Sequence, residues 1–138
     1  MKAEELDALI ERVEKATGPD RETDGLIALS EGWTNLKMPG DRDAYWRKPG
    51  VTQGWNRTAD GPPPYTASID SALALMERVL PGIWYVMAKG RLTESEPLFA
   101  CELLFGEVQQ SIADGPTPSL AIILATLRAL RSIRGGKP

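Results

Sequence analysis

The sequence predicts an α+β protein, an α/β/α layered sandwich in which a small, mainly antiparallel sheet has helices on both faces. Three observations predict this fold. Four segments carry the apolar residues and end signals of helices. Two strand-like segments, residues 83–88 and 98–105, are joined by a connection too short for a parallel crossover. The second is apolar on both alternating faces, which is typical of a strand covered from two sides.

The N-terminal part predicts two helices joined by a tight turn. Residues 2–16 carry one apolar stripe on an otherwise acidic surface. Thr17 and Gly18 end this helix, and Pro19 is expected at the first position of a second helix over 19–30. The acidic surface indicates a solvated face or, alternatively, a face that binds a partner.

Residues 31–60 form an irregular excursion rich in tryptophan and glycine. A segment of this length without helical periodicity favours short strands or a functional excursion over a plain loop. Residues 44–47 and 51–55, bridged by 48–50, are expected to form a small hairpin.

The next stretch predicts a helix over 69–80. The prolines of 62–64 hold the lead-in extended, Ser68 is the expected N-cap, and Pro81-Gly82 ends the helix. The hydroxyls of Thr66 and Ser68 at this helix start either cap the helix or hold an anion there.

The C-terminal part begins with the polar connection 107–115, in which 107–112 are expected to form a short extra strand or turn. Thr117 then caps a helix with Pro118 in its first turn. This helix is apolar around much of its girth, and we expect it to be buried on most sides.

Composition excludes several classes of protein. The 138 residues suit one domain, 1–138, and 42% apolar with 25% charged residues exclude a wholly disordered chain. A net charge of −3 argues against a general binder of nucleic acid or membrane surfaces. The absence of histidine, with Cys101 as the single cysteine, excludes histidine-based nucleophilic catalysis and standard zinc sites. We expect a soluble, cytoplasmic protein that needs no cofactor or metal.

Three short segments occur in order along the chain: Thr17-Gly18-Pro19-Asp20-Arg21-Glu22, Pro64-Tyr65-Thr66-Ala67-Ser68-Ile69-Asp70-Ser71-Ala72-Leu73 and Gly115-Pro116-Thr117-Pro118-Ser119-Leu120-Ala121. In these segments the chain resembles the phage ABA sandwich domain, a family of small bacteriophage and prophage proteins. The resemblance covers roughly residues 4–132, apart from the 31–60 excursion. It implies the α/β/α fold, a phage origin and the cytoplasm of the host cell, and it carries no catalytic residues over to this chain.

One set of residues is a candidate ligand site, because aromatic rings stack on bases and cations neutralise phosphate. Its members are Trp46, Arg47, Lys48, Trp55, Tyr65, Thr66 and Ser68. The alternative is that the tryptophans of the excursion cover the sheet edge and fill a small core. The acidic pairs Asp41/Asp43 and Glu94/Glu96 are candidate cation ligands, or simply solvated charges.

These observations favour a protein that acts by binding rather than by catalysis. The predicted partner is a host protein or a small nucleotide-like anion, and a natural role is interference with host defence. Two alternatives stay open. One is a metal-dependent nucleotide-processing enzyme that uses Asp41, Asp43 or Glu102; the other is a structural or assembly protein, with a homo-oligomer formed through the acidic first helix.

Overall fold

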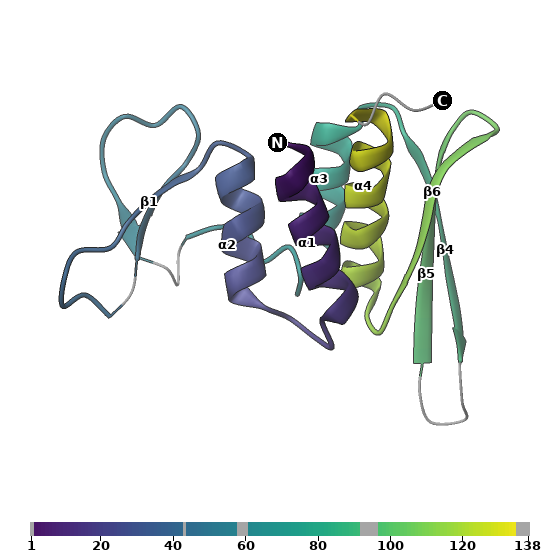
Figure 1. The fold of residues 1–138 in the computed structure, drawn as a ribbon, viewed down its shortest axis with the longest axis horizontal. Coiled ribbons are helices and arrows are strands. Elements are labelled where there is room, and N and C mark those ends of the chain that lie inside the picture. The colour runs from purple at the N-terminus through teal and green to yellow at the C-terminus, as the bar shows by residue number, and fades with distance from the viewer. Residues whose placement is uncertain (1, 43, 58–60, 92–96, 135–138) are drawn as a thin grey trace.

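A computed structural model describes residues 2–42, 44–57, 61–91 and 97–134 of the chain. A three-stranded sheet lies at one end, a smaller three-stranded sheet lies at the other, and four helices stand between them (Figure 1). The α+β class and the antiparallel pairing predicted from the sequence are both confirmed.

The helices follow the apolar spacing of the sequence closely. They are α1 (Ala3–Lys15), α2 (Arg21–Ser30), α3 (Ile69–Val79) and α4 (Pro118–Arg134). The predicted caps of α3 and α4 are confirmed: the Ser68 hydroxyl accepts from the Ser71 amide and the Thr117 hydroxyl accepts from the Leu120 amide. The predicted start of α2 is wrong by two residues, because Asp20 is the N-cap and Pro19 precedes it.

Helix α4 is the centre of the fold. Every residue from Ser119 to Leu127 is buried, as is Ala129, which confirms that this helix is enclosed on most sides. It packs against β5 and β6 of the larger sheet on one side and against α1 and α3 on the other. No helix in the described part of the chain is long and apolar enough to span a bilayer.

Helix α1 is joined to α4 by charge as well as by apolar packing. Arg128 binds Glu14 at 2.7 Å and Arg131 binds Asp7 at 2.7 Å. Asp7 and Glu14 of the acidic face of α1 therefore form ion pairs within the protein. Leu6, Leu9 and Val13 supply the buried stripe on the opposite face.

The larger sheet consists of β4 (Trp84–Arg91), β5 (Pro97–Phe105) and β6 (Val108–Gly115) in that order. The extra strand expected within 107–112 is found, but it is longer than predicted: β6 runs from Val108 to Gly115, so 107–115 is not a polar connection. Gly106, at φ 61°, supplies the left-handed turn that brings the chain back alongside β5. The polar residues of β6 suit its position, because β6 is an edge strand and most of its side chains are exposed or half-buried.

Helices cover only one face of this sheet, so the predicted second helical layer is not found among the described residues. The inner face carries Cys101, Leu103 and Ala113, which are buried against α4. The outer face carries Trp84 and Val86, which are exposed. A strand that is apolar on both faces therefore does not show by itself that both faces are covered within the same chain.

The smaller sheet lies within the excursion. Its strands are β1 (Thr34–Leu36), β2 (Tyr45–Arg47) and β3 (Asn56–Arg57), with β2 in the middle. The predicted hairpin is correct for its first strand only. The partner strand lies at 56–57 rather than 51–55, and β1 was not predicted, because three-residue strands carry little periodic signal.

Gly115 provides a test of how closely β6 and α4 approach each other. A Cβ atom at Gly115 would lie 3.0 Å from the backbone nitrogen of Ala121 and 3.3 Å from Cβ of Leu120. We expect Gly115→Ala to lower the free energy of unfolding by about 1–3 kcal/mol through overpacking. Urea denaturation measures this change. Gly90→Ala is the matched control, since a Cβ atom at Gly90 would meet nothing within 4 Å, and an equal loss in both variants would contradict the explanation.

Candidate ligand-binding site

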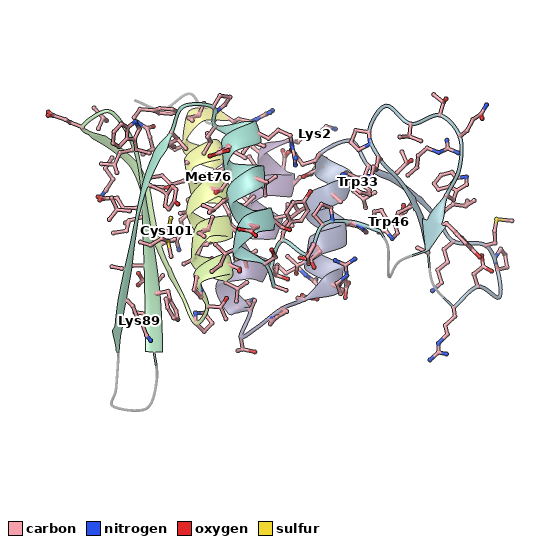
Figure 2. All side chains as sticks on the ribbon, turned by 180° about the vertical axis from the view of Figure 1, so that it is seen from behind. Lys2, Trp33, Trp46, Met76, Lys89 and Cys101 are labelled. Carbon is pink, nitrogen blue, oxygen red and sulfur yellow. The ribbon has the colours of Figure 1, made fainter. Side chains whose placement is uncertain are left out.

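The seven predicted ligand residues do not form one site. Trp46 is buried, and its ring packs on Gly25 of α2, where a Cβ atom would come within 3.2 Å of the indole (Figure 2). Gly25 therefore allows the small sheet to approach α2, a role that the sequence did not suggest. For Trp46 the alternative interpretation, a core tryptophan, is confirmed.

Arg47 and Trp55 form a separate pair. The guanidinium carbon of Arg47 lies 4.0 Å from the ring centroid of Trp55, and its Nε donates to the Gly54 carbonyl at 3.3 Å. This is the geometry of a cation–π contact, with the ring partly exposed. The Arg47 side chain covers one face of the Trp55 ring, so that face is not free to stack on a ligand.

Tyr65, Thr66 and Ser68 are placed by structural roles. Thr66 is buried, and its amide and hydroxyl both donate to Oδ1 of Asp24 at 2.8 Å. The same hydroxyl accepts from the Asp20 amide at 2.8 Å. The alternatives for Thr66 and Ser68 were a structural role and the binding of an anion. Every bond of these side chains is structural: Ser68 caps α3, and Thr66 joins its segment to the start of α2.

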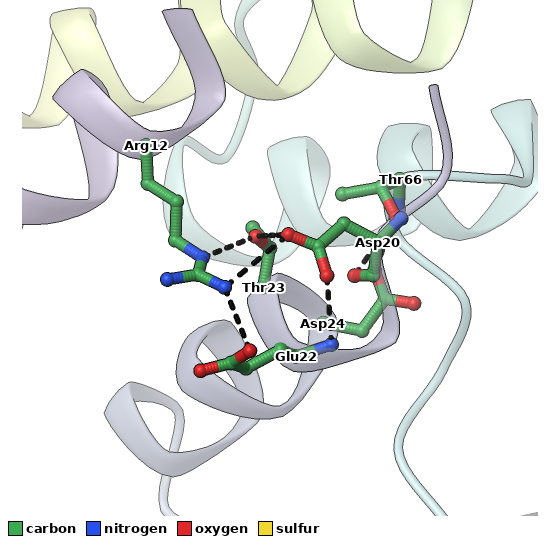
Figure 3. A network of polar contacts seen from close by, with 6 residues as sticks. All are labelled: Arg12, Asp20, Glu22, Thr23, Asp24 and Thr66. Atoms are coloured by element: carbon green, nitrogen blue, oxygen red, sulfur yellow. Dashed lines mark hydrogen bonds and ion pairs between the residues drawn. The ribbon is translucent and has the colours of Figure 1, made fainter. Parts of the chain in front are cut away.

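The bonds of Thr66 belong to a larger network at the start of α2 (Figure 3). Arg12 of α1 donates to the Thr23 hydroxyl at 2.8 Å and pairs with Asp20 at 3.4 Å and Glu22 at 3.1 Å. The Thr23 hydroxyl in turn donates to Asp20 at 2.6 Å. The network joins α1, α2 and the segment before α3, so the acids of the 17–24 region are occupied in holding the fold.

The network also explains an electrostatic shift at Asp20. The bond from the Thr23 hydroxyl lowers the pKa of the Asp20 carboxyl, with the Glu22 amide and the Arg12 charge acting in the same direction against the effect of burial. The folded state therefore favours the ionised carboxylate.

Lys48 reaches a different place, a hollow between the small sheet, the C-terminal ends of α2 and α3, and the proline segment that precedes α3. We call it the junction hollow. It has a volume of about 810 Å³ and is lined by Glu31, Trp33, Lys48, Pro49, Gly61, Pro62, Pro63, Pro64 and Arg78. Sites for small molecules usually measure about 300–1,000 Å³, so the junction hollow is large enough for one.

Charge in the junction hollow is arranged around Arg78. Its Nε donates to Oε1 of Glu31 at 2.9 Å, and the Glu31 side chain is largely buried. Burial lowers the pKa of Arg78, but Glu31 and the nearby Tyr65 hydroxyl outweigh it and leave that pKa raised. Arg78 therefore stays charged, and two cations, Lys48 and Arg78, face one carboxylate.

Tyr65 lies behind this arrangement. Burial raises the pKa of its phenol, and the Arg78 charge opposes that effect. Its hydroxyl has no hydrogen-bond partner of normal geometry among the described residues.

Glu31 and Arg78 were not predicted as site residues. They lie 47 positions apart in the sequence, on the ends of two helices, and no local pattern links them. Trp33, one of the tryptophans of the 31–60 excursion, was not among the predicted ligand residues. The proline run was understood only as a stiff lead-in to α3, whereas in the structure it also forms one wall of the junction hollow.

The other chemical candidates are separate from this hollow. The described residues hold no group of three or more acid or cysteine side chains placed to bind a metal ion. Asp43, Glu94 and Glu96 lie outside the described residues. Asp41 accepts from the Met38 amide at 3.2 Å beside the small sheet, and Glu102 lies on β5 of the larger sheet. These two acids are at opposite ends of the molecule and cannot share one cation (Figure 1).

Comparison with models of protein families finds no match for this sequence, and a search of curated proteins finds none with significant similarity. The resemblance to the phage ABA sandwich domain therefore stays a prediction.

The pKa shift of Asp20 predicts a pH-dependent stability. A depressed pKa adds stability above the unfolded value of about 3.9, and this contribution is lost as the pH falls through the lower folded value. We expect Asp20→Ala to cost about 1 kcal/mol at pH 7, typical of a lost N-cap. Asp20→Asn, which keeps a capping oxygen without the charge, should cost less. Urea denaturation should show that the difference in free energy of unfolding between wild type and Asp20→Asn shrinks toward pH 3. A difference that does not change with pH would contradict this role.

Cys101 is expected to be chemically inert. It is fully buried, and burial raises the pKa of its thiol to about 11. Since the thiolate is the reactive form, we expect negligible reaction with a disulfide reagent at pH 8 in the native protein and complete reaction after unfolding in guanidinium chloride. A Cys101→Ala/Ala88→Cys variant is the control, because Ala88 is exposed on the neighbouring strand. Equal rates for the two native proteins would contradict this assignment.

Proposed function

We propose that this protein acts by binding rather than by catalysis, and that a nucleotide-like anion occupies the junction hollow. The observation that carries the proposal is the combination of Trp33, Lys48 and Arg78 around one hollow of about 810 Å³. An indole offers a flat face for a base, and the two cations can neutralise phosphate oxygens. Glu31 orients Arg78 and offers an acceptor for a ring amine or a sugar hydroxyl.

Rigidity of the lining supports this proposal. Three consecutive prolines form one wall, and proline has little conformational freedom to lose when a ligand binds. Arg78 is already held at 2.9 Å by Glu31, so little side-chain freedom remains to be lost there either.

The biological context of the proposal rests on the family resemblance. A phage protein that binds a nucleotide-like molecule would remove a host signal, and interference with host defence is then its role. We propose this as the cellular function. The alternative of a metal-dependent enzyme receives no support from the positions of Asp41 and Glu102 described above.

Ligand binding is tested by thermal shift and titration calorimetry with nucleotides and cyclic dinucleotides. A ligand at 100 times its dissociation constant should stabilise the protein by about 2.7 kcal/mol. We expect Lys48→Ala to weaken that binding by at least about tenfold, because one charge-assisted hydrogen bond is worth roughly 1.5–3 kcal/mol.

Lys37→Ala is the matched control for Lys48→Ala. It removes the same charge from the neighbouring surface of the small sheet, outside the junction hollow. Equal weakening in both variants would mean that the ligand responds to overall charge and does not occupy the hollow. The absence of a shift with every nucleotide tested would overturn the ligand class.

A further inference from the structure

The outer face of the larger sheet is an apolar surface that the described chain leaves open. The strand register places Trp84 opposite Leu104, and Val86 opposite Glu102. Ile112 of β6 is opposite Glu102 on its other side. Trp84, Val86 and Ile112 are 72%, 54% and 51% exposed, respectively. We call this surface, with Ala88, Ala100 and Leu104, the open face.

The open face differs from scattered surface hydrophobes. Its members come from three adjacent strands and share one side of one sheet, where they surround Glu102 of the central strand. Trp84 has the most exposed large apolar side chain of the described residues. Exposed apolar side chains gathered around a polar group on one face of a sheet are typical of a surface that a partner covers.

Charge on the open face has one sign. Glu102 lies on the central strand with its carboxylate bonded by the Gln109 amide, and Asp114 is exposed on β6. Lys89 belongs to the other side of the sheet, where its ammonium faces the Phe99 ring. No described lysine or arginine shares the outward register of Trp84, Val86 and Ile112.

One basic side chain that reaches the β6 edge of this sheet is already engaged. Arg128 comes from α4, donates to the Ile112 carbonyl at 3.0 Å and pairs with Glu14 at 2.7 Å. The open face therefore has apolar flanks, an acidic centre and, among the described residues, no cation of its own to offset it. Such a surface complements a partner that is apolar and basic.

The dimensions fit one helix. Three strands at about 4.8 Å spacing give a face roughly 14 Å wide, close to the 10–12 Å diameter of a helix with its side chains. Strands of eight or nine residues at about 3.3 Å per residue are roughly 26–30 Å long, the length of a helix of about 18 residues. The inner face of the same sheet receives α4, a helix of 17 residues.

We propose that the open face binds an amphipathic helix of a partner protein, apolar along one side and carrying lysine or arginine where it meets Glu102. This helix would supply the second helical layer. A second copy of this chain fits less well, because a two-fold contact centred on the sheet would place Glu102 against the same residue of the other copy. This binding is independent of the junction hollow, which shares no lining residue with the open face and is formed by the small sheet, the proline segment and the ends of α2 and α3.

The test uses two synthetic helical peptides of 18 residues. One has leucine along one side, interrupted by a lysine at its middle where it meets Glu102, and lysine on the other side; the second has glutamate in place of every lysine. We expect fluorescence anisotropy to show binding of the leucine–lysine peptide, with the leucine–glutamate peptide at least tenfold weaker. Glu102→Gln should weaken the leucine–lysine peptide severalfold, since one charge at the centre of the face is lost.

Val86→Asp is expected to weaken the leucine–lysine peptide at least tenfold, although it adds a negative charge that would favour a basic peptide electrostatically. Val51→Asp is the matched control, since Val51 is 43% exposed near the small sheet and gains the same charge. Val86→Thr, paired with Val51→Thr, repeats the comparison with an isosteric side chain in case an aspartate disturbs β4. Circular dichroism confirms that each variant is folded.

Two results would overturn the proposal. One is binding that fails in the wild type or is equally strong in the Val86 and Val51 variants. The other is a wild-type dimer, seen by analytical ultracentrifugation, that Val86→Asp converts to a monomer, because the open face would then be an interface between copies. If Val86→Asp loses peptide binding but keeps nucleotide binding, the open face and the junction hollow are two independent sites.

Discussion

Burial of α4 is the constraint on which the rest of the structure depends. A helix apolar around most of its girth has to be enclosed, and the sheet, α1 and α3 each cover one part of it. Its basic residues, Arg128 and Arg131, then lie at the rim and bind the acids of α1. The sheet uses its inner face for this task, and its outer face remains available for a partner.

A second constraint is the polar network at the start of α2. Thr66 connects to Asp20 and Asp24 from 42 to 46 residues away, and a buried carboxylate requires such bonds. The network holds the proline run beside α2, which is what creates one wall of the junction hollow. Thr66 therefore positions the candidate site without entering it.

The two candidate surfaces differ in chemistry because they are built from different elements: loops and helix ends form the junction hollow, and three strands form the open face. The junction hollow is lined by rigid prolines, one indole and a fixed ion pair, which suits a small anion. The open face is broad, apolar and acidic at its centre, which suits a basic helix. The helices between them keep the two surfaces apart, so both can be occupied at once (Figure 1).

The sequence by itself determined the four helices, most of β4 and β5, the caps at Ser68 and Thr117 and the burial of α4, because these depend on local periodicity and short-range hydrogen bonds. It also placed Lys48 among the candidates. Tertiary structure alone decided which tryptophan was buried, that the third strand extended to residue 115, and that one face of the sheet stayed open. It alone joined Glu31 to Arg78, because that pairing depends on how two helix ends meet across 47 residues, and no local pattern encodes such a meeting.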